Sequence, residues 1–60
     1  MRARKLFRKL RRAGCIIEPR KGGHHLVTRE ERRIIVPYHG NKEIGKGLLE
    51  KIQKTLDVDL

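Results

Sequence analysis

Residues 2–13 carry the feature that most constrains this chain, a strict division of a helical segment into apolar and basic positions. The apolar side chains recur at intervals of three and four residues, which places them on one stripe: Ala3, Leu6, Phe7, Leu10 and Ala13. Gly14 follows where a helix normally stops. Because such a stripe has to be covered, the pattern predicts a helix over residues 2–13 that packs on another layer.

The other face of this predicted helix is entirely basic: Arg2, Arg4, Lys5, Arg8, Lys9, Arg11 and Arg12. Like charges one helical turn apart repel and weaken a helix, so seven cations with no balancing acid exceed what a solvated face requires. The chain has a net charge of +9, and residues 1–33 hold all of that excess. A polyanion is therefore the expected partner. Binding of the helix to an anionic membrane is the alternative, but so small a domain needs the apolar stripe for its core.

Sixty residues predict a single domain, residues 1–60, with a thin core and no enclosed substrate pocket. Any substrate is therefore expected to bind at the surface. The single cysteine, Cys15, cannot form an intramolecular disulfide, which fits a reducing, cytoplasmic setting. We expect it to be a small buried side chain. No apolar run approaches the roughly 20 residues of a membrane span, and no signal peptide is recognised.

Three short runs with β-branched centres follow the first helix. The predicted strands are residues 15–20, 24–29 and 32–38, joined by turns at residues 21–23 and 30–31. Pro19 and Pro37 lack an N–H group, which places them at a strand's end or on an edge. Short turns between successive strands are typical of an antiparallel meander.

A loop rich in glycine, residues 39–47, leads to a second predicted helix over residues 48–56. One side of this helix is apolar: Leu48, Leu49, Ile52 and Leu56. Residues 57–60 form an acidic tail that is expected to fray. The order α-β-β-β-α predicts an α+β domain in which a three-stranded antiparallel sheet carries both helices on one face.

The turn at residues 21–23 is followed by two histidines. Its glycines tolerate a positive φ and let another backbone approach closely, and histidine can accept and donate a proton near neutral pH. Arg20 and Lys21 add positive charge. A Gly-Gly hairpin beside an ordinary strand histidine is the plainer interpretation of this stretch alone. His24 and His25 must point to opposite faces of the sheet, but the alternation leaves open which face is exposed.

The chain resembles the HicA family of bacterial and archaeal toxins, which are ribosome-independent mRNA interferases with a double-stranded-RNA-binding-domain-like fold. Three stretches carry the resemblance, which covers roughly residues 5–56: Lys21-Gly22-Gly23-His24-His25, Ile35-Val36-Pro37-Tyr38-His39 and Ile44-Gly45-Lys46-Gly47-Leu48. The chain departs from the family pattern at Gly23, where Ser is common, and at Leu48, where Thr is usual.

The resemblance implies a metal-independent endoribonuclease with His24 as the catalytic residue, His25 as runner-up and Gly22 beside it. It also implies mRNA as the substrate and a HicB-type antitoxin protein as the partner, with no cofactor. RNA supplies its own nucleophile, the 2′-OH, so His24 would serve as base or acid. His39 and Tyr38 are the next candidates for a second acid or base. The residues expected to bind RNA are cationic: Arg4, Lys5, Arg8, Arg11, Arg12, Arg20 and Lys21.

Two other functions compete with this interpretation. A non-catalytic RNA-binding module of the same fold could grip phosphates without any histidine. A metal site is disfavoured, because His24 and His25 point to opposite faces of a strand, and neither Cys15 nor His39 has ligand spacing.

Overall fold

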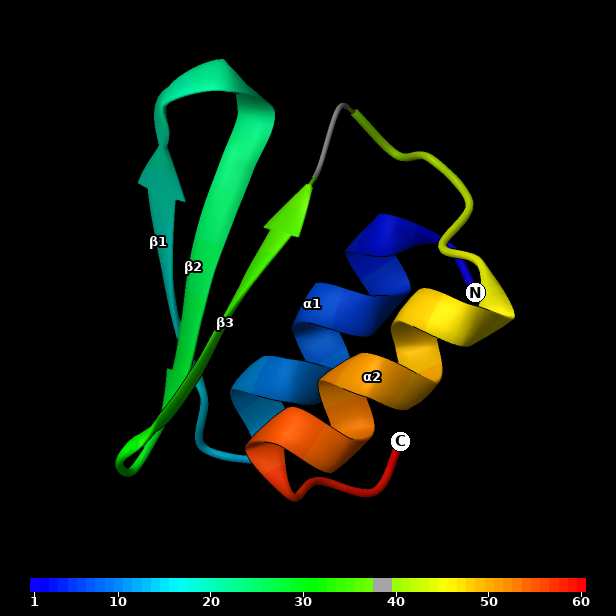
Figure 1. Cartoon of the computed structure of the whole chain (residues 1–60). Coiled ribbons are helices and arrows are strands. Elements are labelled where there is room, and N and C mark those ends of the chain that lie inside the picture. The colour runs from blue at the N-terminus through cyan, green and yellow to red at the C-terminus, as the bar shows by residue number, and fades with distance from the viewer. Residues whose placement is uncertain (38–39) are drawn as a thin grey trace.

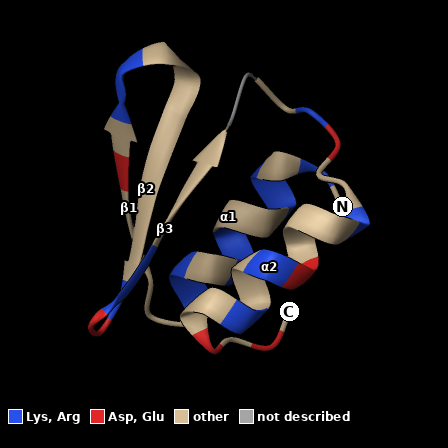
Figure 2. Cartoon of the chain, viewed as in Figure 1, with Lys and Arg blue, Asp and Glu red and all other residues tan. Residues whose placement is uncertain are grey.

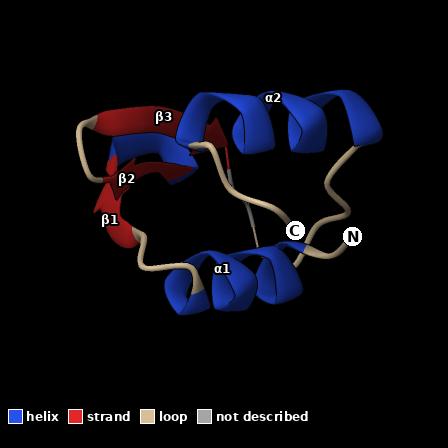
Figure 3. Ribbon diagram, turned by 90° about the horizontal axis from the view of Figure 1, so that it is seen from below, coloured by secondary structure: helices blue, strands red, loops and turns tan. Residues whose placement is uncertain are grey.

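The computed structural model describes residues 1–37 and 40–60. In chain order its elements are α1 (Ala3–Arg12), β1 (Ile16–Arg20), the short 3-10 helix η1 (Lys21–Gly23), β2 (His24–Arg29), β3 (Arg32–Pro37) and α2 (Lys46–Leu56). The strands form one antiparallel sheet in the order β1-β2-β3, and both helices lie on one side of it (Figures 1 and 3). This architecture confirms the predicted α+β domain.

Helix α1 buries its apolar stripe as the pattern predicts. Ala3, Leu6 and Leu10 are fully buried, and Phe7 is nearly so. The helix ends at Arg12, and Gly14 follows with a φ of +89°, a conformation that glycine adopts without a steric penalty. The stripe meets buried side chains of the sheet, the connecting loop and α2 in one core: Val27, Val36, Ile44, Ile52 and Leu56.

Helix α2 begins two residues earlier than the sequence predicted, at Lys46 instead of residue 48. Gly45 precedes the helix in an extended conformation, and its carbonyl oxygen accepts the Leu49 N–H at 3.0 Å. Gly47 therefore lies in the first turn, where the N–H groups have no partner within the helix anyway. The predicted apolar side is confirmed, since Ile52 and Leu56 are fully buried.

The tail after α2 is held in place, so the prediction that residues 57–60 fray is wrong. The side-chain oxygen of Gln53 accepts the Leu60 N–H at 3.0 Å, and its backbone oxygen accepts the Val58 N–H at 3.1 Å. The Lys9 ammonium group donates to the Leu60 carbonyl at 3.2 Å. Val58 and Leu60 pack against the core, which explains why these apolar residues hold an otherwise acidic tail.

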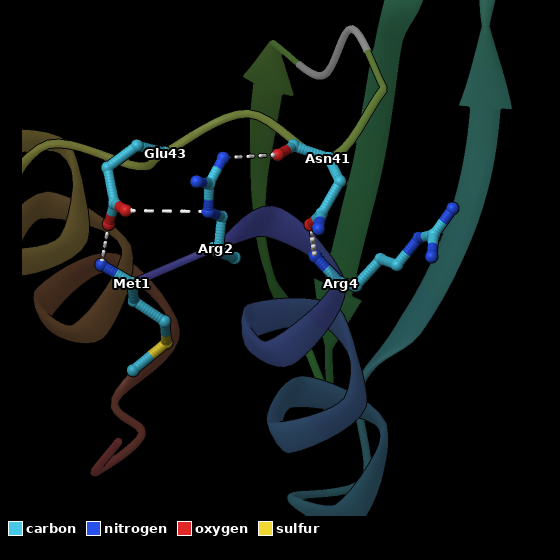
Figure 4. Close-up of polar contacts among 5 residues, drawn as sticks. All are labelled: Met1, Arg2, Arg4, Asn41 and Glu43. Atoms are coloured by element: carbon cyan, nitrogen blue, oxygen red, sulfur yellow. Dashed lines mark hydrogen bonds and ion pairs between the residues drawn. The ribbon is translucent and has the colours of Figure 1, made fainter.

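The loop before α2 caps the N-terminus of α1 (Figure 4). The Lys42 carbonyl accepts the Ala3 N–H at 2.9 Å, and the Asn41 side-chain oxygen accepts the Arg4 N–H at 3.1 Å. These two donors belong to the first turn of α1, whose N–H groups have no acceptor within the helix. A segment about forty residues away thus completes the helix.

The same loop brings a carboxylate to the positive end of α1. Glu43 forms ion pairs with the α-amino group of Met1 and, at 3.9 Å, with the Arg2 guanidinium (Figure 4). The hydrogen bond from the α-amino group lowers the pKa of Glu43. Because α1 has no acidic residue in its own first turn, Glu43 supplies the negative charge that this end of a helix favours.

Candidate functional site

The register of the sheet decides how the two histidines point. Val27 is fully buried beneath the helices, and His25, two positions before it, faces the same way. The His25 ring is half-buried and packs on Phe7 of α1, with ring centroids 5.2 Å apart and planes tilted by 54°. His24 points to the opposite face and is exposed. The structure thus answers the question that the sequence left open.

We call the face away from the helices the open face. It consists of alternate residues of the three strands: Ile16, Glu18, Arg20, His24, Leu26, Thr28, Arg33, Ile35 and Pro37. No element described by the structure covers it (Figure 1). The open face combines an imidazole and cations with exposed aliphatic side chains, since Ile16 is 64% exposed and Ile35 48%.

His24 is held at the start of β2 by the turn that precedes it. Its Nδ1 atom lies 3.1 Å from the carbonyl oxygen of Lys21. A carbonyl oxygen only accepts hydrogen bonds, so this contact places the proton on Nδ1. In the neutral ring Nε2 then carries the lone pair. The arrangement fixes the tautomer and the orientation of the ring, and it makes Nε2 the atom that accepts a proton.

Gly22 makes this arrangement possible through its backbone conformation. Its φ is +74°, in the left-handed region that side chains other than glycine rarely adopt. A Cβ atom at this position would lie 3.4 Å from His24 Nδ1 and 3.6 Å from Cε1. A side chain at residue 22 would thus be in ordinary van der Waals contact with the His24 ring, so the left-handed backbone is what requires glycine here.

Two of the predicted RNA-binding cations lie beside His24. Arg20 is the Cα partner of His24 across β1 and β2, and Lys21 follows it in the exposed turn. The Arg20 guanidinium is 3.9 Å from the Glu18 carboxylate, with both side chains about half exposed. An exposed pair of this kind contributes little energy, so a phosphate can compete for Arg20.

The remaining predicted cations lie on α1, where Lys and Arg recur along the helix (Figure 2). All five side chains are exposed: Arg4, Lys5, Arg8, Arg11 and Arg12. The structure therefore places the predicted RNA-binding residues in two groups, one at the 21–23 turn and one along α1. Tyr38 and His39, the candidates for a second acid or base, lie outside the described residues.

Arg29 has a structural role that sequence reasoning missed. It belongs to the cationic excess of residues 1–33, yet its guanidinium donates to backbone carbonyls of Ala13, Leu56 and Asp57 at 3.1–3.3 Å. The alternation along β2 puts Arg29 on the same face as Val27, but the sequence did not show that this face is the one beneath the helices. This cation stabilises the fold.

Cys15 is buried as predicted, and burial raises the pKa of its thiol, with the nearby charge of Arg29 opposing the shift. Within residues 1–37 and 40–60, no three His, Cys, Asp or Glu side chains are grouped so as to hold a metal ion. No helix within the described residues has the length and apolar character needed to cross a membrane.

Fold and site together define a small basic α+β domain that presents an oriented imidazole and a flanking arginine on the open side of a sheet. Residues 3–58 match the family model described as "HicA toxin of bacterial toxin-antitoxin". The chain belongs to this family and is the toxin component of a toxin–antitoxin pair. No curated protein and no solved structure matches it.

Proposed function

We propose that this toxin is an endoribonuclease that cleaves mRNA in the cytoplasm, with His24 as the group that transfers the proton. One observation carries the proposal: the hydrogen bond between His24 Nδ1 and the Lys21 carbonyl, which leaves Nε2 as an exposed base. A histidine held for structural reasons alone would not need an exposed ring of fixed tautomer. The family membership supports the same assignment.

The reaction requires little beyond this equipment. His24 Nε2 removes the proton of a ribose 2′-OH, and the resulting oxyanion attacks the adjacent phosphorus. The bond to the 5′-oxygen of the next nucleotide breaks, and that oxygen takes a proton from water or from a second acid. The products are a 2′,3′-cyclic phosphate and a 5′-hydroxyl end. Arg20 and Lys21 stabilise the negative charge that builds on the phosphate. RNA supplies the nucleophile itself, so the proposed step needs no metal ion.

The proposed partner is an antitoxin of the HicB type that covers the open face. A protein seated over His24 blocks access of RNA by steric exclusion. Exposed cations at Arg20, Lys21 and Arg33 favour an acidic surface on that partner, because complementary charge speeds association. The aliphatic side chains of Ile16 and Ile35 offer it apolar contact area.

The test compares substitutions at the two neighbouring histidines. His24→Ala is expected to lower the single-turnover cleavage rate by about 10²–10⁴-fold, the usual share of one acid–base group. His24→Asn should lose the same activity, although its amide can still donate to the Lys21 carbonyl. Both variants should keep the melting temperature and RNA affinity of the parent chain, because the exposed ring contributes no core packing.

His25→Ala is the matched control, since it removes an identical side chain one residue along. It should keep most of the rate at saturating protein while lowering the melting temperature, because it removes the ring that packs on Phe7. Cleavage should persist with a chelator present and yield the cyclic phosphate. Full activity in His24→Ala would refute the assignment, and RNA binding without any cleavage by the parent chain would favour a non-catalytic RNA-binding module.

A further inference from the structure

A groove of about 280 Å³ runs between α1 and the edge strand β1, on the opposite side of the sheet from His24. Its lining includes six of the described residues: Arg4, Phe7, Arg11, Ile17, Pro19 and His25. Its volume is just below the range of ligand pockets, about 300–1,000 Å³. The groove therefore suits a ligand no larger than one nucleotide.

One wall of the groove is cationic. Arg4 and Arg11 lie seven residues apart on α1, so two helical turns, roughly 10 Å along the axis, separate them on the same side of the helix. Among the described residues, neither guanidinium has an ion-pair partner, and no carboxylate lines the groove. The Arg4 side chain extends away from the capping loop toward the sheet (Figure 4). Two guanidinium groups are therefore available to an anion.

The rest of the lining is apolar or aromatic. Ile17 and Pro19 come from β1, and the His25 ring lies beside them on β2, because Pro19 and His25 are Cα partners. An unstacked nucleobase packs against a flat ring such as that of His25 and against apolar surfaces such as those of proline and isoleucine. A free phosphate would use only the cationic wall, whereas a nucleotide uses both.

We propose that this groove binds one nucleotide of the RNA strand, with its phosphate between Arg4 and Arg11 and its base against Ile17 and the His25 ring. The inference rests on the proposed function, because it concerns the same RNA. The RNA strand passes over the end of β1, where Arg20 faces the open face and Pro19 faces the groove. His24 and His25 then act on one RNA strand from the two faces of the sheet, the first on the scissile phosphate and the second on a neighbouring nucleotide.

The test uses a short RNA with a 2′-deoxy nucleotide at the cleavage position, so that binding is measured without cleavage. Fluorescence anisotropy compares the double variant Arg4→Ala/Arg11→Ala with Lys5→Ala/Arg12→Ala. The second pair lies on the same helix with the same spacing and removes the same charge, but it does not line the groove. We expect the groove pair to lose about tenfold in affinity and the comparison pair about two- to threefold.

A scan of single abasic sites along the RNA tests the apolar wall. One abasic position near the cleavage site should weaken binding to the parent chain more than binding to the groove variant, which no longer holds the phosphate of that nucleotide. Equal losses in the two double variants, or no such position in the scan, would overturn the groove and leave the role of His24 standing. A parent chain that fails to cut an all-ribose strand, while the groove pair still binds more weakly than the comparison pair, would overturn the proposed function and support the groove.

Discussion

Replacing Arg29 with alanine tests whether this cation stabilises the fold instead of binding RNA. The side chain leaves β2 on the helix side and donates to three backbone carbonyl oxygens. Its Nε atom contacts Ala13 O at 3.3 Å, and its Nη1 atom contacts Leu56 O at 3.2 Å and Asp57 O at 3.1 Å. These acceptors lie at the C-terminal ends of α1 and α2, where a positive charge is favourable.

The size of the effect follows from these contacts. A hydrogen bond from a charged donor contributes about 1.5–3 kcal/mol when buried. Two of the three bonds are partly buried and the third is exposed, so solvent reduces their joint contribution to about 3 kcal/mol. A 60-residue domain has a total free energy of unfolding of about 3–9 kcal/mol. Arg29→Ala should therefore remove at least a third of the stability, and Arg29→Lys, which cannot reach both helix ends, about half as much.

The measurement is urea denaturation followed by circular dichroism, which avoids the salt effect of guanidinium. Arg32→Ala is the control, because Arg32 is the Cα partner of Arg29 on β3 and is exposed. Its removal should change stability by less than about 0.5 kcal/mol. Equal denaturation midpoints for the two variants would refute the structural role of Arg29. Folded Arg29→Ala should also bind RNA with the salt dependence of the parent chain, since this cation contacts no phosphate.

Two further predictions concern Gly22 and Glu43. Gly22→Ala should cost about 1–2 kcal/mol of stability, because alanine is strained at φ +74°. It should also lower the cleavage rate of the remaining folded protein, because relief of that strain moves the turn whose Lys21 carbonyl orients His24; an unchanged rate per folded molecule would contradict this role of the turn. The hydrogen bond from the Met1 amine lowers the pKa of Glu43 in the folded chain, so its contribution to stability is present above the usual carboxyl value of about 4.3 and is lost as pH falls through the lower folded value. Glu43→Gln should therefore flatten the acid limb of the melting-temperature profile, and identical limbs in the two proteins would argue against the pair.

The helices and strands were predictable where a binary pattern was strong. The division of residues 2–13 into apolar and basic positions predicted α1. The turns at Gly22 and Glu30 predicted the bounds of β2 and the order of the strands. The start of α2 was misplaced because Gly45 and Gly47 both look like loop residues, although glycine is tolerated in a first helical turn. The tail was misjudged because its acids were weighed more heavily than Val58 and Leu60, which reach the core.

The geometry of the site was less accessible from the sequence. Each face of β2 carries a histidine and an apolar residue: His24 shares one face with Leu26, and His25 shares the other with Val27. The pattern alone therefore could not show which face is buried. Complete burial of Val27 settles the matter. The contact from His24 to the Lys21 carbonyl depends on the left-handed backbone at Gly22, and a sequence pattern does not specify such an angle.

Arg4 lies where a chain selected for stability alone would not place a cation. Its position in the first turn of α1 is at the positive end of the helix dipole, which costs about 0.3–1 kcal/mol. The loop offsets that cost, since the Asn41 side chain accepts the Arg4 N–H and Glu43 brings a carboxylate to the same end. Both compensating contacts leave the Arg4 guanidinium itself without an acidic partner among the described residues, and its side chain lines the groove. Because the fold tolerates the charge of Arg4 without pairing it, this guanidinium remains available to a phosphate. This supports the proposal that RNA binds between α1 and β1.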